Sequence, residues 1–147
     1  MHLLVVPCHR DEAAKEIMNN KKVIQEVQAL FSENVILDNV ALVIIDGCDP
    51  EKALKTLSYN TKLGIKFKEV KLFTNKNIEN PNADIEVIIP QSHELNNLNS
   101  YGDFLLTELH KFINTQFCLI IQNDGFIVDP SLWDFNFLLY DYIGAHW

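Results

Sequence analysis

The sequence lacks several features that would assign a function at once. Neither glycine-rich phosphate-binding pattern, G-x-G-x-x-G or G-x-x-x-x-G-K-[ST], occurs in its 147 residues, which argues against a nucleotide-binding domain built on such a loop. No apolar run approaches the roughly 20 residues that a membrane-spanning helix needs. The opening residues, MHLLVVPCHR, are too short and lack the positively charged start of a signal peptide. We therefore expect a cytoplasmic protein with no membrane span.

Basic residues are also scarce. Twelve Lys and Arg against twenty Asp and Glu give a formal net charge of −8, which argues against a nucleic-acid-binding protein. An acidic protein that binds a phosphorylated small molecule needs a metal ion or local helix N-termini to do so. The three cysteines, Cys8, Cys48 and Cys118, each lie within or just after a strand-like run. That pattern is typical of small buried side chains in a reducing compartment.

The apolar residues that are present fall into strand-like and helix-like patterns. Hydrophobic residues make up 48% of the chain, and its length suits one domain with a real core. Continuous apolar runs predict strands that are buried on both faces of a largely parallel sheet. These runs are residues 3–6, 40–45, 70–73, 86–89, 117–121 and 126–128.

Three segments with helical periodicity alternate with these runs: residues 11–31, 50–63 and 100–113. Asp49 can cap the second helix, Pro50 suits its first position, and Gly64 is a stop signal. Ser100 is a possible cap for the third. The order predicts an α/β fold of three layers, a mainly parallel central sheet flanked by helices. Residues 1–34 would form an N-terminal strand and amphipathic helix, and residues 35–147 the main domain.

Two carboxylates follow predicted strands: Asp46 closes VALVIID and Asp124 closes CLIIQND. Ligands of open parallel sheets bind beyond the carboxyl ends of the strands, so these two aspartates are expected on one rim. Each also has a simpler interpretation. Asp46-Gly47 is compatible with a plain strand-to-helix turn. Asn123-Asp124-Gly125 is compatible with a hairpin turn, because Asp-Gly between strands is a common hairpin signal.

Four stretches carry a resemblance to a known family. They are VALVIIDGCDPEKALKTLSYN, KEVKLFTN, NSYGDFLLTELHKFINTQFCLIIQNDGF and WDFNFLLYDYIGAHW. The last two are the most specific, with a Gln-x-Asp-Gly-Phe turn followed by Trp133 and then by residues 140–145. From about residue 35 to residue 147 the chain resembles a domain family of unknown function that is grouped with the GT-A type glycosyltransferases. The resemblance covers roughly three quarters of the chain.

The resemblance implies a GT-A, or Rossmann-like, fold that binds a nucleotide sugar and transfers the sugar to an unknown acceptor. Asp124 stands where GT-A enzymes carry an Asp-x-Asp element, and Gln122 replaces its first acidic position. Mg²⁺ or Mn²⁺ held by Asp124 would bridge and neutralise the diphosphate.

The same resemblance implies the rest of the nucleotide-sugar site. Asp46 matches the end of the first GT-A strand, where the base and ribose commonly dock. Tyr101 and Asp103 match a helix that lines the same pocket, and Asn123 adjoins Asp124. We expect four side chains to face one shared cleft: those of Asp46, Tyr101, Asp103 and Asp124.

Two departures from the family weaken the expectation of catalysis. His146 stands where relatives have proline, and relatives continue beyond the position of Trp147 into the acceptor side. The chain would then be a truncated version, the N-terminal half of a transferase, and its catalytic residues are unknown. The alternative is a non-catalytic GT-A-like remnant that acts as a binding or oligomerisation module. Apolar surface left uncovered by the shortened fold predicts a homo-oligomer.

Overall fold

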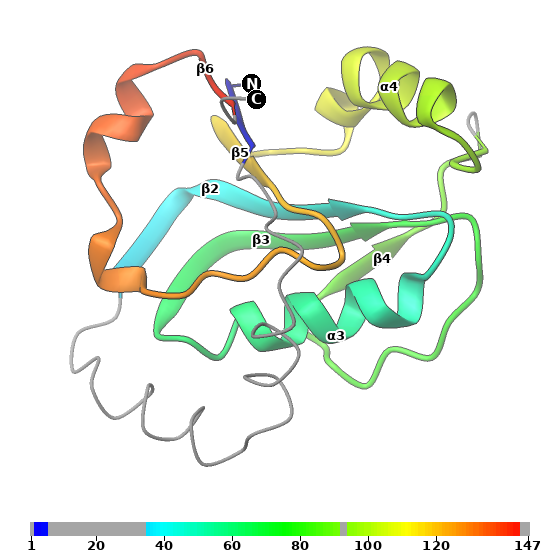
Figure 1. The fold of residues 1–147 in the computed structure, drawn as a ribbon, viewed down its shortest axis with the longest axis horizontal. Coiled ribbons are helices and arrows are strands. Elements are labelled where there is room, and N and C mark those ends of the chain that lie inside the picture. Colours follow the sequence, from blue (N-terminus) through cyan, green and yellow to red (C-terminus); the bar gives the residue numbers. More distant parts are fainter. Residues whose placement is uncertain (1, 6–34, 92–93, 145–147) are drawn as a thin grey trace.

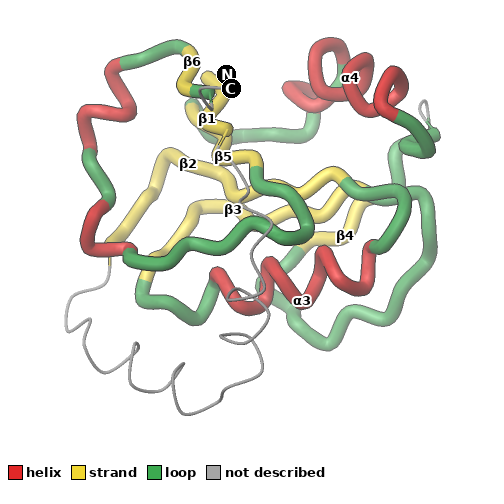
Figure 2. The backbone as a smooth tube through the Cα atoms, in the orientation of Figure 1, coloured by secondary structure: helices red, strands yellow, loops and turns green. Residues whose placement is uncertain are grey.

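A parallel sheet organises the part of the chain that the structure describes. The structure is a computed structural model, and it describes residues 2–5, 35–91 and 94–144. The sheet has six strands in the order β4-β3-β2-β5-β1-β6, and every neighbouring pair is parallel (Figures 1 and 2). The strands are β1 His2–Val5, β2 Val35–Ile45, β3 Ile65–Phe73, β4 Glu86–Ile88, β5 Phe117–Ile120 and β6 Tyr142–Ile143.

Helices cover both faces of this sheet (Figure 1). Helix α3, Pro50–Asn60, connects β2 to β3 on one face. Helix α4, Leu98–Thr107, and the 3-10 turn η1, Leu109–Lys111, lie between β4 and β5 on the other face. The prediction of an α/β fold with a parallel sheet between helices is confirmed. Within the described residues, no helix is long and apolar enough to cross a membrane.

Strand β2 lies at the centre of the core, between β3 and β5. Its residues 40–45 are at most 7% exposed. Leu42 and Ile44 pack into the cluster on the α3 face, whereas Ala41 and Val43 pack into the cluster on the α4 face. Because both faces are covered, this strand is a continuous apolar run rather than an alternating one.

The helix boundaries differ from the predicted ones by a few residues. Asp49 caps α3 as predicted, accepting a hydrogen bond from the Lys52 backbone N–H at 3.1 Å. The helix ends at Asn60 instead of residue 63, and Gly64, with φ of 75°, forms the turn that leads into β3. Helix α4 begins at residue 98 rather than 100, because Asn97 is its cap and Ser100 only completes the capping box.

The remaining predictions concern one strand, the cysteines and the first helix, and their outcomes differ. Residues 126–128 are not a strand, so that prediction is wrong; the Ile127 N–H bonds to the Asn60 side chain of α3 instead of to a ladder partner. Cys118 is buried, and burial raises the pKa of its thiol to about 12. Cys48 is exposed in the loop after β2, so the prediction that it is buried is wrong. The predicted helix 11–31 and Cys8 lie outside the described residues.

Beyond β5 the chain forms an arm, residues 126–141, that runs back across the α3 face and along one side of the molecule to β6 (Figure 1). The arm contains two short 3-10 helices, η2 Pro130–Leu132 and η3 Phe135–Leu139. Its Trp133 and Phe137 rings meet edge to face, with centroids 5.5 Å apart, and both pack against the core cluster of that face.

Candidate functional site

The strand order reverses between β2 and β5. From β2 the chain passes through α3 to β3 and then to β4 on one side of β2, and it returns through α4 to β5 on the other side. Because parallel crossovers are right-handed, this reversal also places α3 and α4 on opposite faces. Ligands of open parallel sheets bind beyond the carboxyl ends of the strands at such a reversal. We therefore treat residues 46–52 and 122–125, which follow β2 and β5, as the candidate site and call them the rim site.

Asp46 connects the two halves of the rim site. Its Oδ1 accepts the backbone N–H groups of Cys48 at 2.7 Å and Asp49 at 2.8 Å, which shapes the loop between β2 and α3. Its Oδ2 accepts a hydrogen bond from Asn123 Nδ2 at 2.5 Å. The structure thus brings together two residues that the sequence predicted for one site. It also supports the strand-to-helix turn, since Asp46 organises that turn.

Lys52 is a member of the rim site that sequence reasoning missed. Its Nζ donates to Asn123 Oδ1 at 3.1 Å, while the amide nitrogen of Asn123 bonds to Asp46. The amide of Asn123 is therefore oriented by a carboxylate on one side and an ammonium on the other. A second ammonium lies beside the same loop, because Lys76 Nζ donates to the Cys48 carbonyl at 2.6 Å.

Lys52 begins a polar stripe along α3 that consists of Lys52, Thr56 and Asn60. Thr56 Oγ1 donates to the Asn123 carbonyl at 2.7 Å. Asn60 Nδ2 donates to the Gly125 carbonyl at 3.2 Å, and Asn60 Oδ1 accepts the Ile127 N–H at 2.8 Å. Four helical residues advance about 6 Å, and two residues of an extended chain advance about 6.6 Å. Every fourth residue of α3 can therefore meet every second residue of the segment 123–127.

Asp124 lies in a turn at the rim site and is half-buried. The Gly125 N–H donates to the Gln122 carbonyl at 2.9 Å, so residues 122–125 form the turn that the hairpin interpretation expected. The hairpin itself is absent from the described structure, because no strand after the turn pairs with β5.

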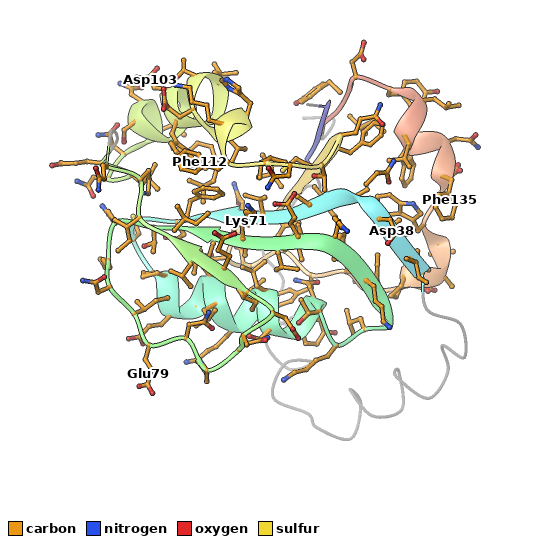
Figure 3. All side chains as sticks on the ribbon, turned by 180° about the vertical axis from the view of Figure 1, so that it is seen from behind. Asp38, Lys71, Glu79, Asp103, Phe112 and Phe135 are labelled. Atoms are coloured by element: carbon orange, nitrogen blue, oxygen red, sulfur yellow. The ribbon has the colours of Figure 1, made fainter. Side chains whose placement is uncertain are left out.

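The structure places Tyr101 and Asp103 away from the α3 stripe. Both belong to α4, which covers the opposite face of the sheet (Figure 1). Tyr101 packs against the core cluster of that face, and burial raises the pKa of its hydroxyl. Asp103 is exposed and points away from the sheet (Figure 3). Within the described part of the chain, neither side chain hydrogen-bonds to the rim site.

The donor groups of the rim site do not fit a preformed divalent metal site. Among the described residues, no three His, Cys, Asp or Glu side chains come together in a way that could hold a metal ion. Both oxygens of Asp46 already accept N–H groups. Mg²⁺ and Mn²⁺ prefer several oxygen ligands, and the described residues of the rim site bring no such group of carboxylates together.

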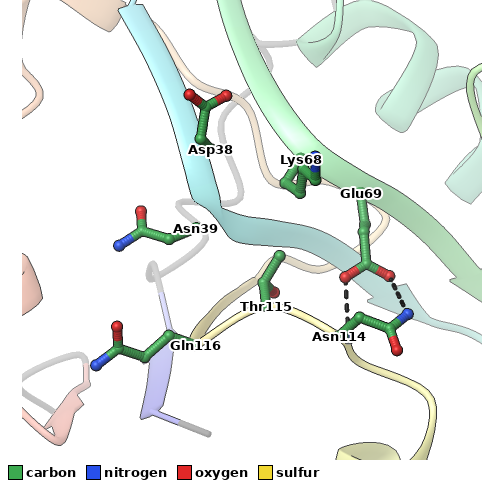
Figure 4. A pocket seen from close by; sticks show the side chains of 7 residues that line it. All are labelled: Asp38, Asn39, Lys68, Glu69, Asn114, Thr115 and Gln116. Atoms are coloured by element: carbon green, nitrogen blue, oxygen red, sulfur yellow. Dashed lines mark hydrogen bonds between the residues drawn. The ribbon is translucent and has the colours of Figure 1, made fainter.

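A separate cavity of about 330 Å³ lies at the amino end of β5 (Figure 4), whereas the rim site follows the carboxyl end of that strand. It is lined by Asp38, Asn39, Lys68, Glu69, Asn114, Thr115 and Gln116. It forms where the pairing of β2 with β3 shifts register between Leu37 and Ala41. Glu69 is committed to structure, because it accepts two hydrogen bonds from Asn114 and pairs with Lys71 at 2.7 Å. We assign no ligand to this cavity.

Part of the chain matches a known family. Residues 84–147 match the model of a family described as "Protein of unknown function (DUF5672)". No curated protein and no solved structure matches the chain. The matched residues include α4, β5, the turn at 122–125 and the arm, but not Asp46 or the α3 stripe.

Proposed function

We propose that the chain binds a nucleotide sugar at the rim site, as the nucleotide-side part of a GT-A-like glycosyltransferase. The observation that carries the proposal is the reversal of strand order between β2 and β5, with Asp46 and Asn123 in contact at that point. Sheets of this kind bind nucleotides beyond the carboxyl ends of their strands at such a reversal. The resemblance of residues 35–147 to the GT-A group points to the same edge.

The residues of the rim site have separate roles in this proposal. Asp46 holds the loop after β2, so its contribution is to position the other groups. Asn123 presents an amide whose orientation is fixed on both sides, and such a group can select among the hydroxyl and carbonyl groups of a ligand. Asp124 as a ligand of Mn²⁺ or Mg²⁺ stays a prediction. The acceptor and the catalytic residues stay unassigned.

A thermal-shift panel tests the proposal. UDP-, GDP- and CMP-sugars are added with and without Mn²⁺, and the melting temperature is recorded. A ligand at 100 times its dissociation constant adds about 2.7 kcal/mol of stability, which raises the melting temperature of a chain this long by roughly 5–10 °C.

Asn123→Ala should abolish this shift, whereas Asn136→Ala, an exposed asparagine on the arm, should leave it intact. The proposal fails if no nucleotide sugar shifts the melting temperature in either condition.

A second candidate function, a binding or oligomerisation module, is favoured by the arm. Ten large hydrophobic side chains are exposed in the described residues, and six of them lie between residues 128 and 142. They are Val128, Leu132, Phe135, Leu139, Tyr140 and Tyr142. Because Trp133 and Phe137 pack inward, the arm is apolar on both sides, and such surfaces often mark association sites.

We propose that the arm mediates self-association. Light scattering should show a species larger than a monomer, and the double change Leu132→Ser and Leu139→Ser should reduce it. Leu106→Ser, which removes an equally exposed leucine from α4, is the control. A monodisperse monomer at high protein concentration would contradict the proposal.

A further inference from the structure

We propose that Lys52, rather than a divalent metal ion, supplies the positive charge that holds the diphosphate of the ligand. The inference rests on the proposed function, because it names the group that contacts the diphosphate at the rim site. It departs from the expectation that Mn²⁺ or Mg²⁺ on Asp124 performs this task.

The position of the ammonium is the first argument. Lys52 Nζ lies 3.1 Å from Asn123 Oδ1, so it stands between α3 and the segment that follows β5, at the reversal of strand order. An ammonium has three N–H donors, and this hydrogen bond uses one of them. A lysine ammonium binds phosphate as a compact point charge.

The backbone of the rim site is the second argument. The N–H groups around the start of α3 could also bind an anion, but three of them bind the protein's own carboxylates. Asp46 accepts those of Cys48 and Asp49, and Asp49 accepts that of Lys52. The side chain of Lys52 is therefore the ammonium of α3 that lies against the segment after β5 at the rim site.

The carboxylates of the rim site are the third argument. Three N–H groups converge on the two oxygens of Asp46, so this carboxylate, with about four lone-pair sites, has one site left for a metal, on Oδ2. Asp124 follows Asn123 directly, so its negative charge lies close to where the diphosphate would bind. Without a metal ion, the Asp124 carboxylate repels the negatively charged diphosphate. With a divalent ion bound to the diphosphate, the carboxylate attracts that ion.

The two explanations therefore predict opposite results for the same pair of variants. If Lys52 holds the diphosphate, Lys52→Gln should weaken binding and Asp124→Asn should leave it unchanged or tighten it. If a metal on Asp124 holds the diphosphate, Asp124→Asn should abolish binding. Gln at position 52 removes the charge and keeps an amide N–H donor, one bond nearer the backbone than the ammonium, so the variant tests the charge while it keeps a polar group beside Asn123.

The experiment is isothermal titration of the full chain with UDP, with GDP and with inorganic pyrophosphate, in EDTA and in Mn²⁺. Pyrophosphate carries the diphosphate without base or sugar, so it reports on the charge alone. We expect binding of at least one probe in EDTA, weakened about ten-fold or more by Lys52→Gln. We expect Lys55→Gln, an exposed lysine one turn further along α3, to change it less than three-fold. Binding of the wild type should also weaken as salt is added.

Three outcomes overturn the inference, and they differ in what they leave standing. Binding that requires Mn²⁺ and disappears in Asp124→Asn removes Lys52 from its role but keeps the proposed nucleotide site. Binding in EDTA that Lys52→Gln leaves unchanged does the same. No binding of any probe, and no effect of any nucleotide sugar on the melting temperature of the wild type, removes the proposed function together with the inference. Circular dichroism of each variant establishes that it is folded.

Discussion

Replacing Asn60 by Ala should destabilise the protein although Asn60 belongs to no predicted site. The side chain is 0% exposed, at the last position of α3. Its amide donates to the carbonyls of Thr56 at 2.9 Å and Gly125 at 3.2 Å, and its oxygen accepts the Ile127 N–H at 2.8 Å. Alanine keeps the helix but removes all three hydrogen bonds at once.

The size of the effect follows from these three bonds. A hydrogen bond contributes about 1 kcal/mol net, and a buried group left without its partner costs about 1–3 kcal/mol. The Gly125 carbonyl and the Ile127 N–H both lose their Asn60 partner, and the better helix propensity of alanine returns about 0.5 kcal/mol. We expect a loss of roughly 3 kcal/mol, a large part of the 5–15 kcal/mol that typically stabilises a domain.

Urea unfolding followed by far-ultraviolet circular dichroism measures this loss. Ser58→Ala, on the same helix but outside the polar stripe, should change the free energy of unfolding by less than about 0.5 kcal/mol. Asn60→Asp keeps an acceptor for the Ile127 N–H but buries a carboxylate against the Thr56 and Gly125 carbonyls, so it should be no more stable than Asn60→Ala. A loss below about 1 kcal/mol for Asn60→Ala would refute the argument that this side chain fastens the segment after β5.

Two further predictions concern the loop after β2 and the charges on β3. Gly47→Ala should cost about 1–3 kcal/mol in urea unfolding, because a Cβ there would overlap the Leu95 carbonyl oxygen; Gly102→Ala in α4, where a Cβ meets nothing, should instead add about 0.5–1 kcal/mol. Burial raises the pKa of Glu69, but hydrogen bonds and the Lys71 charge outweigh it and lower the pKa below 4.5. Glu69 therefore stabilises the folded state above pH 4.5, and this stabilisation is lost as the pH falls through the folded-state pKa. Burial lowers the pKa of Lys71, but its bonds to glutamates outweigh it and raise the pKa above 10.5. Lys71 therefore stabilises the folded state below pH 10.5, and this stabilisation is lost as the pH rises through the folded-state pKa. Unfolding curves across pH should show Glu69→Gln flattening the acid side and also reducing the alkaline loss, because Glu69 is one of the two glutamates that raise the Lys71 pKa; an unchanged acid side would contradict this assignment.

The central part of the fold could be predicted because its signals are local. The run at residues 40–45 is apolar throughout, and a strand buried on both faces needs that composition. Asp49-Pro50 sets the start of α3 through a cap and a fixed φ, both determined by neighbouring residues. The contact between Asp46 and Asn123 could also be anticipated, since parallel strands end on one rim.

The missed features depend on contacts between distant residues. Thr56 and Asn60 alternate with the apolar residues of α3. Hydrophobic periodicity alone therefore predicts that they lie at the edge of the buried face of the helix. Their partners lie 65–67 residues further along the chain. The same contacts explain why residues 126–128 resemble a strand in composition but do not pair as one. Polar residues at i, i+4 and i+8, beside the apolar residues of the same helix, were the available signal.

The polar stripe of α3 leads to a separation between stability and ligand binding. Asn60 is buried and bonds to the backbone beyond the turn, whereas Lys52 is only half-buried and bonds to a side chain at the rim. A buried group left without its partner costs more than an exposed one, so stability should depend mainly on the Asn60 end. Charge reaches a ligand only at the Lys52 end. Asn60→Ala should therefore lower the melting temperature while the folded protein keeps its affinity for a diphosphate. Lys52→Gln should lower that affinity while the melting temperature changes little. If both variants lowered both quantities in proportion, the stripe would act as one unit, and loss of binding in Lys52→Gln could not be attributed to the charge.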